Sequence, residues 1–509
     1  MAGNSLTVQK ITTFFLRYRY WLLCGLILVM MVSRANNSYW VGDFWEHSSV
    51  IRELATHPLN PVHPQILSEA PSAFNTPYHW LLGLAANLSG RSAVETLAVA
   101  GLVNLLLYFI GFYLFVSSLD RSNGPGLAFY ALLLTLLFWG VYVWNFSGYY
   151  HLRILGSIIP YPSMFAMALS LIALWLNSLR IEKKNDWWLL PIWLIASVVL
   201  LTHSITFIFL AAGLLAFTLQ SGKRFGFELL KIAGFLALAI GTALLWPYYP
   251  FLKLLLGETA LYHASNRDMY EHLWYRTWPL LIGIPLLFIE ARKNWRSPLP
   301  WMFIVLLAVY VYGWATASFS YGRVMSYLGV ILQITIAVYL LKLELFAGDR
   351  FRKAPTGQAL FSLIATLALF GLTWNSQIMP FFNTVIPGDG NHLEKYLFLS
   401  EYTDQYDVIL TDLDSSMIVP TFGGKVVAYA RPLPFVADAD QRVDDVNRFY
   451  DPQTSRAERS EILKKYAVNY ILLEKKPEAN WEETRRIIAP FSELVYRGKR
   501  FLLYRVAEK

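Results

Sequence analysis

The chain has 509 residues, of which 56% are hydrophobic and only 15% are charged. Soluble domains of ordinary composition carry about 25% charged residues, so most of this chain is predicted to lie in a membrane. The formal net charge of +8 does not indicate nucleic-acid binding, because no basic stripe is interleaved with aromatic residues. The single cysteine, Cys24, excludes an intramolecular disulfide framework and a cysteine-rich zinc site.

Charge is unevenly distributed along the chain and predicts two domains. Residues 1–377 contain 25 Lys/Arg and 15 Asp/Glu, whereas the much shorter 378–509 contain 18 and 20. The first part is predicted to be a transmembrane domain whose first outer loop, residues 37–96, holds the candidate catalytic acids. The second part has the charge density of a water-exposed domain.

Apolar runs predict an α-helical polytopic membrane protein with about eleven transmembrane helices. These runs cover residues 20–32, 97–118, 125–145, 160–179, 187–202, 204–220, 227–247, 278–290, 299–318, 324–343 and 358–378. The N-terminus and the short turns on its side of the membrane hold 17 Lys/Arg, and the longer loops on the opposite side hold eight. Positive residues gather in cytoplasmic loops, so the N-terminus is predicted to be cytoplasmic and the C-terminal domain extracytoplasmic.

The C-terminal part alternates probable strands with probable helices, which predicts a small α/β domain. The strands are expected at residues 406–410, 426–429, 468–473 and 501–504, and the helices at 440–450, 455–466 and 481–488.

The first outer loop combines acids, imidazoles and aromatic rings. Its sequence includes Gly42-Asp43-Phe44-Trp45-Glu46-His47 and later Pro77-Tyr78-His79-Trp80. Aromatic faces can pack against sugar rings, and a carboxylate can take the proton of an attacking hydroxyl. The loop therefore suits carbohydrate chemistry beside a bilayer; the alternative is an interfacial belt of Trp and Tyr with solvated acids.

In these features the chain resembles the GT-C membrane glycosyltransferases, among them the bacterial members related to the protein mannosyltransferases and the aminoarabinose lipid A transferase. The resemblance covers nearly the whole chain and rests on several short motifs in a set order. They are the Gly-Asp-x-x-x-His loop at Gly42, Tyr161-Pro162-Ser163, Thr202-His203-Ser204, Trp246-Pro247-Tyr248-Tyr249, Tyr321-Gly322-Arg323 and the tail from Ile462 to Leu473.

The resemblance implies transfer of a sugar from a polyprenyl-phosphate-linked donor to an acceptor glycan, lipid or protein, with inversion, at the outer face of a bacterial plasma (inner) membrane. Asp43 matches the acidic residue of the family and would be the general base, with Glu46 as the second candidate. On a helix, Asp43, Glu46 and His47 would share one face, so a metal site or a carboxylate pair is an alternative interpretation of these residues. Residues 146–159 contain no second acidic pair, so a divalent cation lacks that support and no metal ligand is assigned.

The other candidate site residues are expected to bind substrate. Arginine suits a lipid phosphate because of its planar fork, and Arg323 stands at the mouth of an apolar run; the alternative for Arg323 is an interface anchor. The remaining candidates are His47, Tyr78, His79, Arg153, Tyr161, His203 and Tyr321. The expected partners are the lipid-linked donor, the acceptor and membrane lipids, without nucleic acid.

Two other functions fit a polytopic chain. A polymerase or ligase of lipid-linked glycans would differ mainly in the size of the carrier-linked glycan. A lipid or sugar transporter would usually show two related halves, and no half-to-half likeness occurs here. The Asp412-Leu413-Asp414 pattern is typical of metal and nucleotide-sugar binding, but it lies in the domain predicted to be outside, where nucleotide sugars are not supplied.

Overall fold

The computed structural model describes residues 2–36, 40–256, 264–350, 354–385, 392–476 and 481–507. Residues 37–39 of the predicted first outer loop and residues 386–391, 477–480 and 508–509 of the predicted C-terminal domain lie outside the described residues.

The chain folds into two compact units that are interleaved in sequence. The first unit contains Met1–Asn37, Ala100–Trp246 and Phe251–Gly388, and the second contains Ser38–Val99, Pro247–Pro250 and Asp389–Lys509. The loop after the first helix thus belongs to the same unit as the C-terminal residues. The domain boundary at residues 377 and 378, which follows composition alone, stays a prediction.

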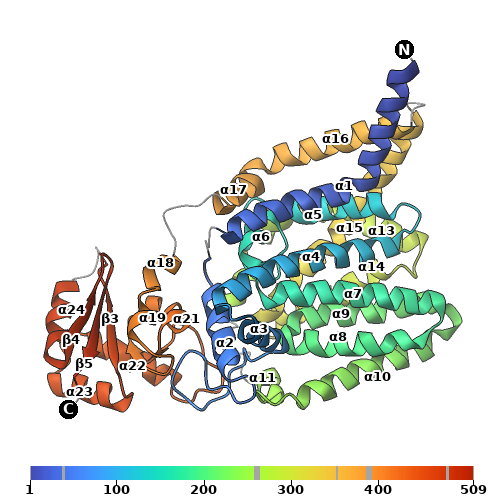
Figure 1. Cartoon of the computed structure of the whole chain (residues 1–509). Coiled ribbons are helices and arrows are strands. Elements are labelled where there is room, and N and C mark those ends of the chain that lie inside the picture. Colours follow the sequence, from blue (N-terminus) through green and yellow to red (C-terminus); the bar gives the residue numbers. More distant parts are fainter. Residues whose placement is uncertain are drawn as a thin grey trace. The chain divides into compact units, whose positions relative to one another are not determined.

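The first unit is helical, as expected where backbone groups must find their hydrogen bonds without water. Its helices are α1 (Ala2–Asn36), α4 (Ala93–Leu119, which begins in the second unit), α5 (Gly124–Leu137), α6 (Leu152–Ile158), α7 (Pro162–Lys183), α8 (Leu189–Thr202), α9 (Ser204–Phe217), α10 (Phe225–Leu244), α11 (Phe251–Leu256), α12 (Leu273–Thr277), α13 (Gly283–Lys293), α14 (Pro298–Ala315), α15 (Met325–Arg350), α16 (Ala354–Thr373) and α17 (Met379–Val385). Short 3-10 or π segments are η1 (Asp186–Trp188), η2 (Thr218–Arg224), η4 (Ala264–Tyr270), η5 (Trp278–Ile282), η6 (Phe319–Val324) and η7 (Trp374–Ile378). Helices α7, α8, α9 and α14 run side by side (Figure 1).

Eight helical segments among the described residues are long and apolar enough to cross a membrane. They are Gln9–Ala35, Ala93–Leu119, Pro162–Lys183, Ser204–Gly222, Phe225–Leu244, Pro298–Ala315, Phe319–Arg350 and Pro355–Val385. Each corresponds to one of the eleven predicted runs.

The predicted count of about eleven spans is not confirmed, because three apolar runs form shorter elements. Gly124–Leu137 and Asp186–Thr202 are shorter apolar helices, and residues 278–290 divide between η5 and α13. After α5 the chain turns, and the Gly140 amide donates to the Arg276 carbonyl oxygen at 3.0 Å. Hydropathy does not separate a spanning helix from such an apolar segment packed against another chain segment.

The second unit contains two helices from the early loop and a small α/β part. The early helices are α2 (Phe44–Thr56) and α3 (Pro77–Ser89), which pack closely where a Cβ on Gly83 would lie 2.6 Å from the Leu54 Cβ. The later helices are α18 (His392–Tyr396), α19 (Leu399–Tyr402), α20 (Leu413–Ser416), α21 (Val419–Phe422), α22 (Ala439–Tyr450), α23 (Arg456–Lys465) and α24 (Trp481–Ile488), with the 3-10 segment η8 (Ala489–Phe491).

Five strands form one mixed sheet in the order β2-β1-β3-β5-β4. They are β1 (Val408–Leu410), β2 (Lys425–Val426), β3 (Tyr470–Glu474), β4 (Ser492–Arg497) and β5 (Phe501–Val506). β1 pairs parallel with β2 and β3, whereas β5 pairs antiparallel with β3 and β4. The predicted strands correspond to β1, β2, β3 and β5, and the sequence analysis missed β4.

The sheet joins the early loop to the C-terminal residues. Ile66 forms a parallel bridge with Val426, whose amide donates to the Gln65 carbonyl oxygen at 2.8 Å. A core of strand residues and residues from α22, α23 and α24 is buried in this unit, including Val446, Phe449 and Ile471. This unit therefore holds α2, the element that carries the predicted catalytic acids.

Candidate active site

The two candidate acids lie at the start of α2. Gly42 has a positive φ of 65°, a conformation that favours glycine, and the chain then enters the helix through Asp43. Asp43 occupies the capping position, but its side chain makes no capping hydrogen bond. Glu46 follows one helical turn later and is buried, with 3% of its side chain exposed, whereas the Asp43 side chain is 31% exposed.

One arginine contacts both acids. Arg431 forms an ion pair with Asp43, and its Nη1 lies 3.4 Å from the Glu46 Oε2. This arginine comes from the segment after β2, 385 residues later in the chain than Glu46. Arg431 is not among the residues predicted for the site, because its local sequence signal is limited to its place just after a predicted strand.

Burial controls the protonation of Glu46. Burial raises the pKa of Glu46 to about 8, while the charge of Arg431 lowers it and the charge of Asp43 raises it. Tyr429, also buried, interacts with the Glu46 carboxyl group. A carboxyl group with this pKa keeps its proton at neutral pH and cannot accept another, so the more exposed Asp43 is the better base candidate.

The two candidate histidines of this loop, His47 and His79, contact each other. His79 Nε2 lies 3.0 Å from His47 Nδ1, and His79 Nδ1 lies 2.9 Å from the Thr76 hydroxyl. Burial holds the pKa of His79 well below its usual value, so this ring is neutral. Its two nitrogens link the Thr76 hydroxyl to the His47 ring. Tyr78 is buried, with its ring centroid 5.5 Å from that of His79.

The structure places the other predicted site residues in the first unit, and Arg323 lies in a polar cluster there. It belongs to η6, immediately before α15, and its Nε donates to the Asn266 side chain at 3.2 Å. Its Nη1 donates to the Ser147 hydroxyl at 3.4 Å, and its guanidinium lies 5.8 Å from the centroid of the Phe146 ring.

The charge of Arg323 also acts on a chain of hydrogen bonds that begins at His203. His203 separates α8 from α9 in an extended conformation, with its Nδ1 2.7 Å from the Thr206 hydroxyl. The Thr206 hydroxyl lies 2.7 Å from the Tyr327 hydroxyl. His203 therefore has both a structural role as a helix cap and a place beside the arginine.

The remaining predicted residues make contacts of other kinds. The Tyr321 ring packs 5.7 Å from that of Tyr312, and Tyr161 is the buried residue that precedes α7. Arg153 lies in α6, where its backbone amide donates to the Gln377 side chain at 3.2 Å.

The Asp412-Leu413-Asp414 pattern serves the local fold. Lys476 Nζ lies 3.3 Å from Asp412 Oδ1 and 2.7 Å from Asp414 Oδ2, and Asp412 also accepts from the Ser415 amide at the start of α20. Within the described ranges, no group of three or more His, Cys, Asp or Glu side chains is arranged to hold a metal ion.

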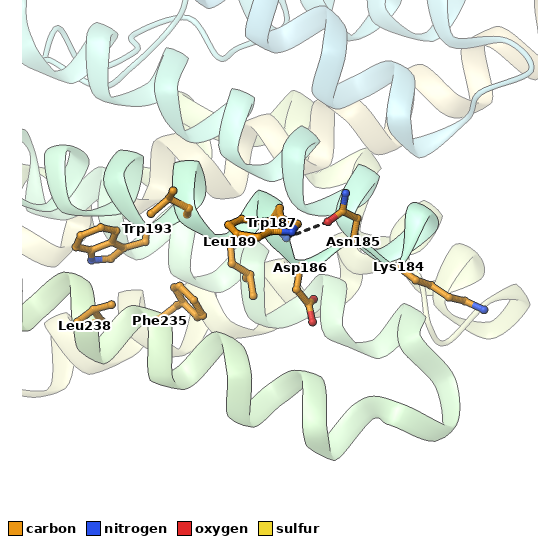
Figure 2. Close-up of a pocket in the computed structure, with 9 residues that line it drawn as sticks. Lys184, Asn185, Asp186, Trp187, Leu189, Trp193, Phe235 and Leu238 are labelled. Atoms are coloured by element: carbon orange, nitrogen blue, oxygen red, sulfur yellow. Dashed lines mark hydrogen bonds between the residues drawn. The ribbon is translucent and has the colours of Figure 1, made fainter.

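An open groove of about 600 Å³ lies in the first unit, and its lining includes none of the predicted site residues (Figure 2). Its lining residues are Lys184, Asn185, Asp186, Trp187, Leu189, Leu190, Trp193, Phe235 and Leu238. The polar residues gather at one end, where Asp186 is paired with Arg180 and Lys231. The rest of the lining is mostly apolar, and its carboxylate, Asp186, is already engaged by these two cations.

No family model matches the chain, and no curated protein matches its sequence. The fold is similar to that of AglB, the oligosaccharyltransferase of Archaeoglobus fulgidus, in complex with an inhibitory peptide and a dolichol-phosphate, with a TM-score of 0.57, 11% identity, and 97% of this chain and 75% of that chain covered. For the same archaeal enzyme in complex with Zn and sulfate, the TM-score is 0.55 and the identity 13%, with 89% of this chain and 68% of that chain covered. For ArnT from Cupriavidus metallidurans in the apo state, the TM-score is 0.53 and the identity 12%, and both chains are covered in full.

These identities are too low to transfer an activity, but the likeness extends over nearly the whole chain. The GT-C resemblance predicted from the sequence is confirmed at the level of the fold. The chain is therefore a multi-pass membrane protein with the fold of AglB and ArnT.

Proposed function

We propose that this protein is a membrane glycosyltransferase that transfers a sugar from a polyprenyl-phosphate-linked donor to an acceptor hydroxyl at the outer face of the plasma (inner) membrane. The observation that carries the proposal is the acidic start of α2. There the Asp43 side chain is partly exposed, makes no capping hydrogen bond and forms an ion pair with Arg431. The likeness to AglB, whose structure contains a dolichol-phosphate, supports a lipid phosphate as carrier.

In the proposed reaction Asp43 takes the proton of the acceptor hydroxyl. The acceptor oxygen forms a bond to the anomeric carbon as the bond from that carbon to the phosphate oxygen breaks. The electron pair leaves with the polyprenyl phosphate, and attack opposite the leaving group inverts the anomeric centre. Arg323 is proposed to bind the lipid phosphate, because a guanidinium pairs with phosphate oxygens and stabilises their developing charge.

The decisive experiment compares Asp43→Asn with Glu46→Gln in the purified full chain, using short-chain polyprenyl-phosphate-linked sugars and detection of released polyprenyl phosphate. Asp43→Asn preserves size but removes the proton acceptor, so turnover is expected to fall by about a hundred- to ten-thousandfold. Glu46→Gln keeps a neutral group at a position that is mostly protonated at pH 7, so its turnover is expected to stay within about tenfold of wild type.

Near-normal turnover in Asp43→Asn, or loss of turnover only in Glu46→Gln, would contradict the assignment of the base. Mass spectrometry of surface glycans and lipid-linked sugars in a deletion strain would identify the sugar and the acceptor. Accumulation of an intact lipid-linked oligosaccharide would favour the ligase alternative, which the similarity to an oligosaccharyltransferase keeps as the second candidate.

A further inference from the structure

We propose that Arg431 is a positioning residue for the transfer reaction, and that its guanidinium holds the Asp43 carboxylate in the orientation needed to take the acceptor proton. This inference rests on the proposed function of Asp43. It assigns a role in the reaction to a residue of the C-terminal part.

The geometry of the acidic pair suits a shared cation. Asp43 and Glu46 are one helical turn apart, so the two carboxylates repel each other once Glu46 loses its proton. The planar fork of an arginine can approach two carboxylates with separate nitrogens, which the single ammonium group of lysine does less well. Arg431 does this with Nη2 toward Asp43 and Nη1 toward Glu46.

The segment that carries Arg431 is anchored to its surroundings. The neighbouring Ala430 amide donates to the Ser416 hydroxyl at 3.1 Å, and the Val426 amide donates to the Gln65 carbonyl oxygen in the early loop. The Thr421 hydroxyl donates to the Trp45 carbonyl oxygen at 3.0 Å, inside α2 itself. These hydrogen bonds fix the backbone that carries the Arg431 guanidinium toward α2.

The exposure of the ion pair argues against a purely stabilising role. Another ion pair on α2, between Glu53 and Lys425, is buried on both sides, with side chains 0% and 3% exposed. Arg431 and Asp43 are 34% and 31% exposed, and ion pairs in contact with water contribute little to stability. The partial exposure instead leaves room for an acceptor hydroxyl to approach the carboxylate.

The first test is a double-mutant cycle on the purified full chain in detergent, which needs no substrate. Apparent unfolding midpoints are compared for wild type, Asp43→Asn, Arg431→Met and the double variant. Because the pair is partly exposed, the expected coupling is small: Arg431→Met lowers the midpoint by more in the wild-type background than in Asp43→Asn. Additive changes would overturn the contact and with it the proposal.

The second test is the pH dependence of turnover. The groups that act on Glu46 are Arg431, Asp43 and Tyr429, and the charge of Arg431 lowers the pKa of Glu46. Loss of the Glu46 proton near pH 8 places a second negative charge beside Asp43, so turnover is expected to change there. Arg431→Met is expected to move this change upward by about one pH unit and to reduce turnover about ten- to a hundredfold. Arg431→Lys, which keeps the charge but loses the fork, is expected to retain most of the pH profile with intermediate turnover.

Two matched variants identify the source of the effect. Glu46→Gln should abolish the pH-dependent change, which assigns it to Glu46. Arg448→Met removes another arginine paired with an acid of the same unit, Asp445, and should leave turnover and pH profile at wild-type values.

Reduced turnover of Arg431→Met with an unshifted pH profile would mean a structural role alone and would overturn the proposal. The proposed function fails separately: if Asp43→Asn keeps its turnover, the base assignment is wrong, whatever the double-mutant cycle shows. If Asp43→Asn is inactive and Arg431→Met behaves as wild type, only the positioning proposal is wrong.

Discussion

Glu46 shows how burial changes the chemistry of a side chain that looks equivalent to its neighbour in the sequence. Asp43 and Glu46 stand one turn apart, yet Glu46 is buried and has a pKa of about 8. The folded state therefore holds a proton on Glu46 that the unfolded chain releases at its ordinary value near 4.5. Between these values the folded state binds more protons, so stability falls as pH rises from about 4.5 to about 8.

Glu46→Gln should remove this pH dependence. The variant is expected to gain stability relative to wild type as pH rises from 5 to 8, by at most about 5 kcal/mol. The measurement is the apparent unfolding midpoint of both proteins at several pH values. A constant difference across this range would contradict the raised pKa.

Arg323 is the residue of the first unit whose function can be tested by binding. Arg323→Ala removes the guanidinium, and Arg323→Lys keeps only its charge, so affinity for a short-chain polyprenyl phosphate should fall most in the alanine variant. The expected loss is about 1 to 3 kcal/mol for a desolvated contact. Titration of the purified variants measures it.

The matched control is Arg267→Ala, since Arg267 belongs to the adjacent η4 and has a side chain 71% exposed. Its affinity should equal that of wild type. Equal affinity in Arg323→Ala would return Arg323 to the role of an interface anchor.

At the scale of elements, the second unit depends on a buried ion pair between α2 and β2. Lys425 Nζ lies 2.7 Å from Glu53 Oε2 and 3.1 Å from the Pro64 carbonyl oxygen. Burial lowers the pKa of Lys425, and the charge of Glu53 acts in the opposite direction. Glu53→Gln leaves this ammonium buried without a charged partner and is expected to destabilise the protein by about 3 to 5 kcal/mol.

Glu53→Gln combined with Lys425→Met should recover much of that loss, because both charges are removed together. Asp414→Asn is the exposed control: its partner Lys476 is partly exposed, and the expected change is about 0 to 1 kcal/mol. Unfolding midpoints of the three variants provide the comparison. A Glu53→Gln protein as stable as Asp414→Asn would show that the buried pair does not join the two elements.

At the scale of the whole molecule, the orientation in the membrane is the property that the proposed chemistry requires. The distribution of 17 and eight Lys/Arg predicts that the C-terminal residues are outside and the turn after α7 is inside. Single cysteines at Asp414, whose side chain is 85% exposed, and at the exposed Lys183 report on the two sides in a Cys24→Ser background. An impermeant thiol reagent on intact cells should label position 414 and spare position 183.

The reverse labelling pattern would overturn the orientation and place Asp43 on the cytoplasmic side. Labelling of both positions only after the membrane is permeabilised would likewise contradict an extracytoplasmic C-terminus.

Composition and periodicity by themselves determined that the chain is a multi-pass helical membrane protein with a small C-terminal α/β part. Eight predicted spans and four of the five strands were found this way, because apolar run length and strand alternation are local properties of the sequence. The strand β4 was missed because its burial is only partial along its length, which weakens the apolar pattern. The two candidate acids, Asp43 and Glu46, were also identified from the local sequence of the first outer loop.

Only the tertiary structure decided which side chains meet. The pairing of Arg431 with Asp43, the contact between His47 and His79, and the joining of Ile66 to β2 each connect segments that the sequence presents apart. Burial, which gives Glu46 and Asp43 different protonation, likewise depends on what packs over α2. Local patterns record which residues are apolar or charged, whereas ion pairs and desolvation arise from neighbours that folding brings together.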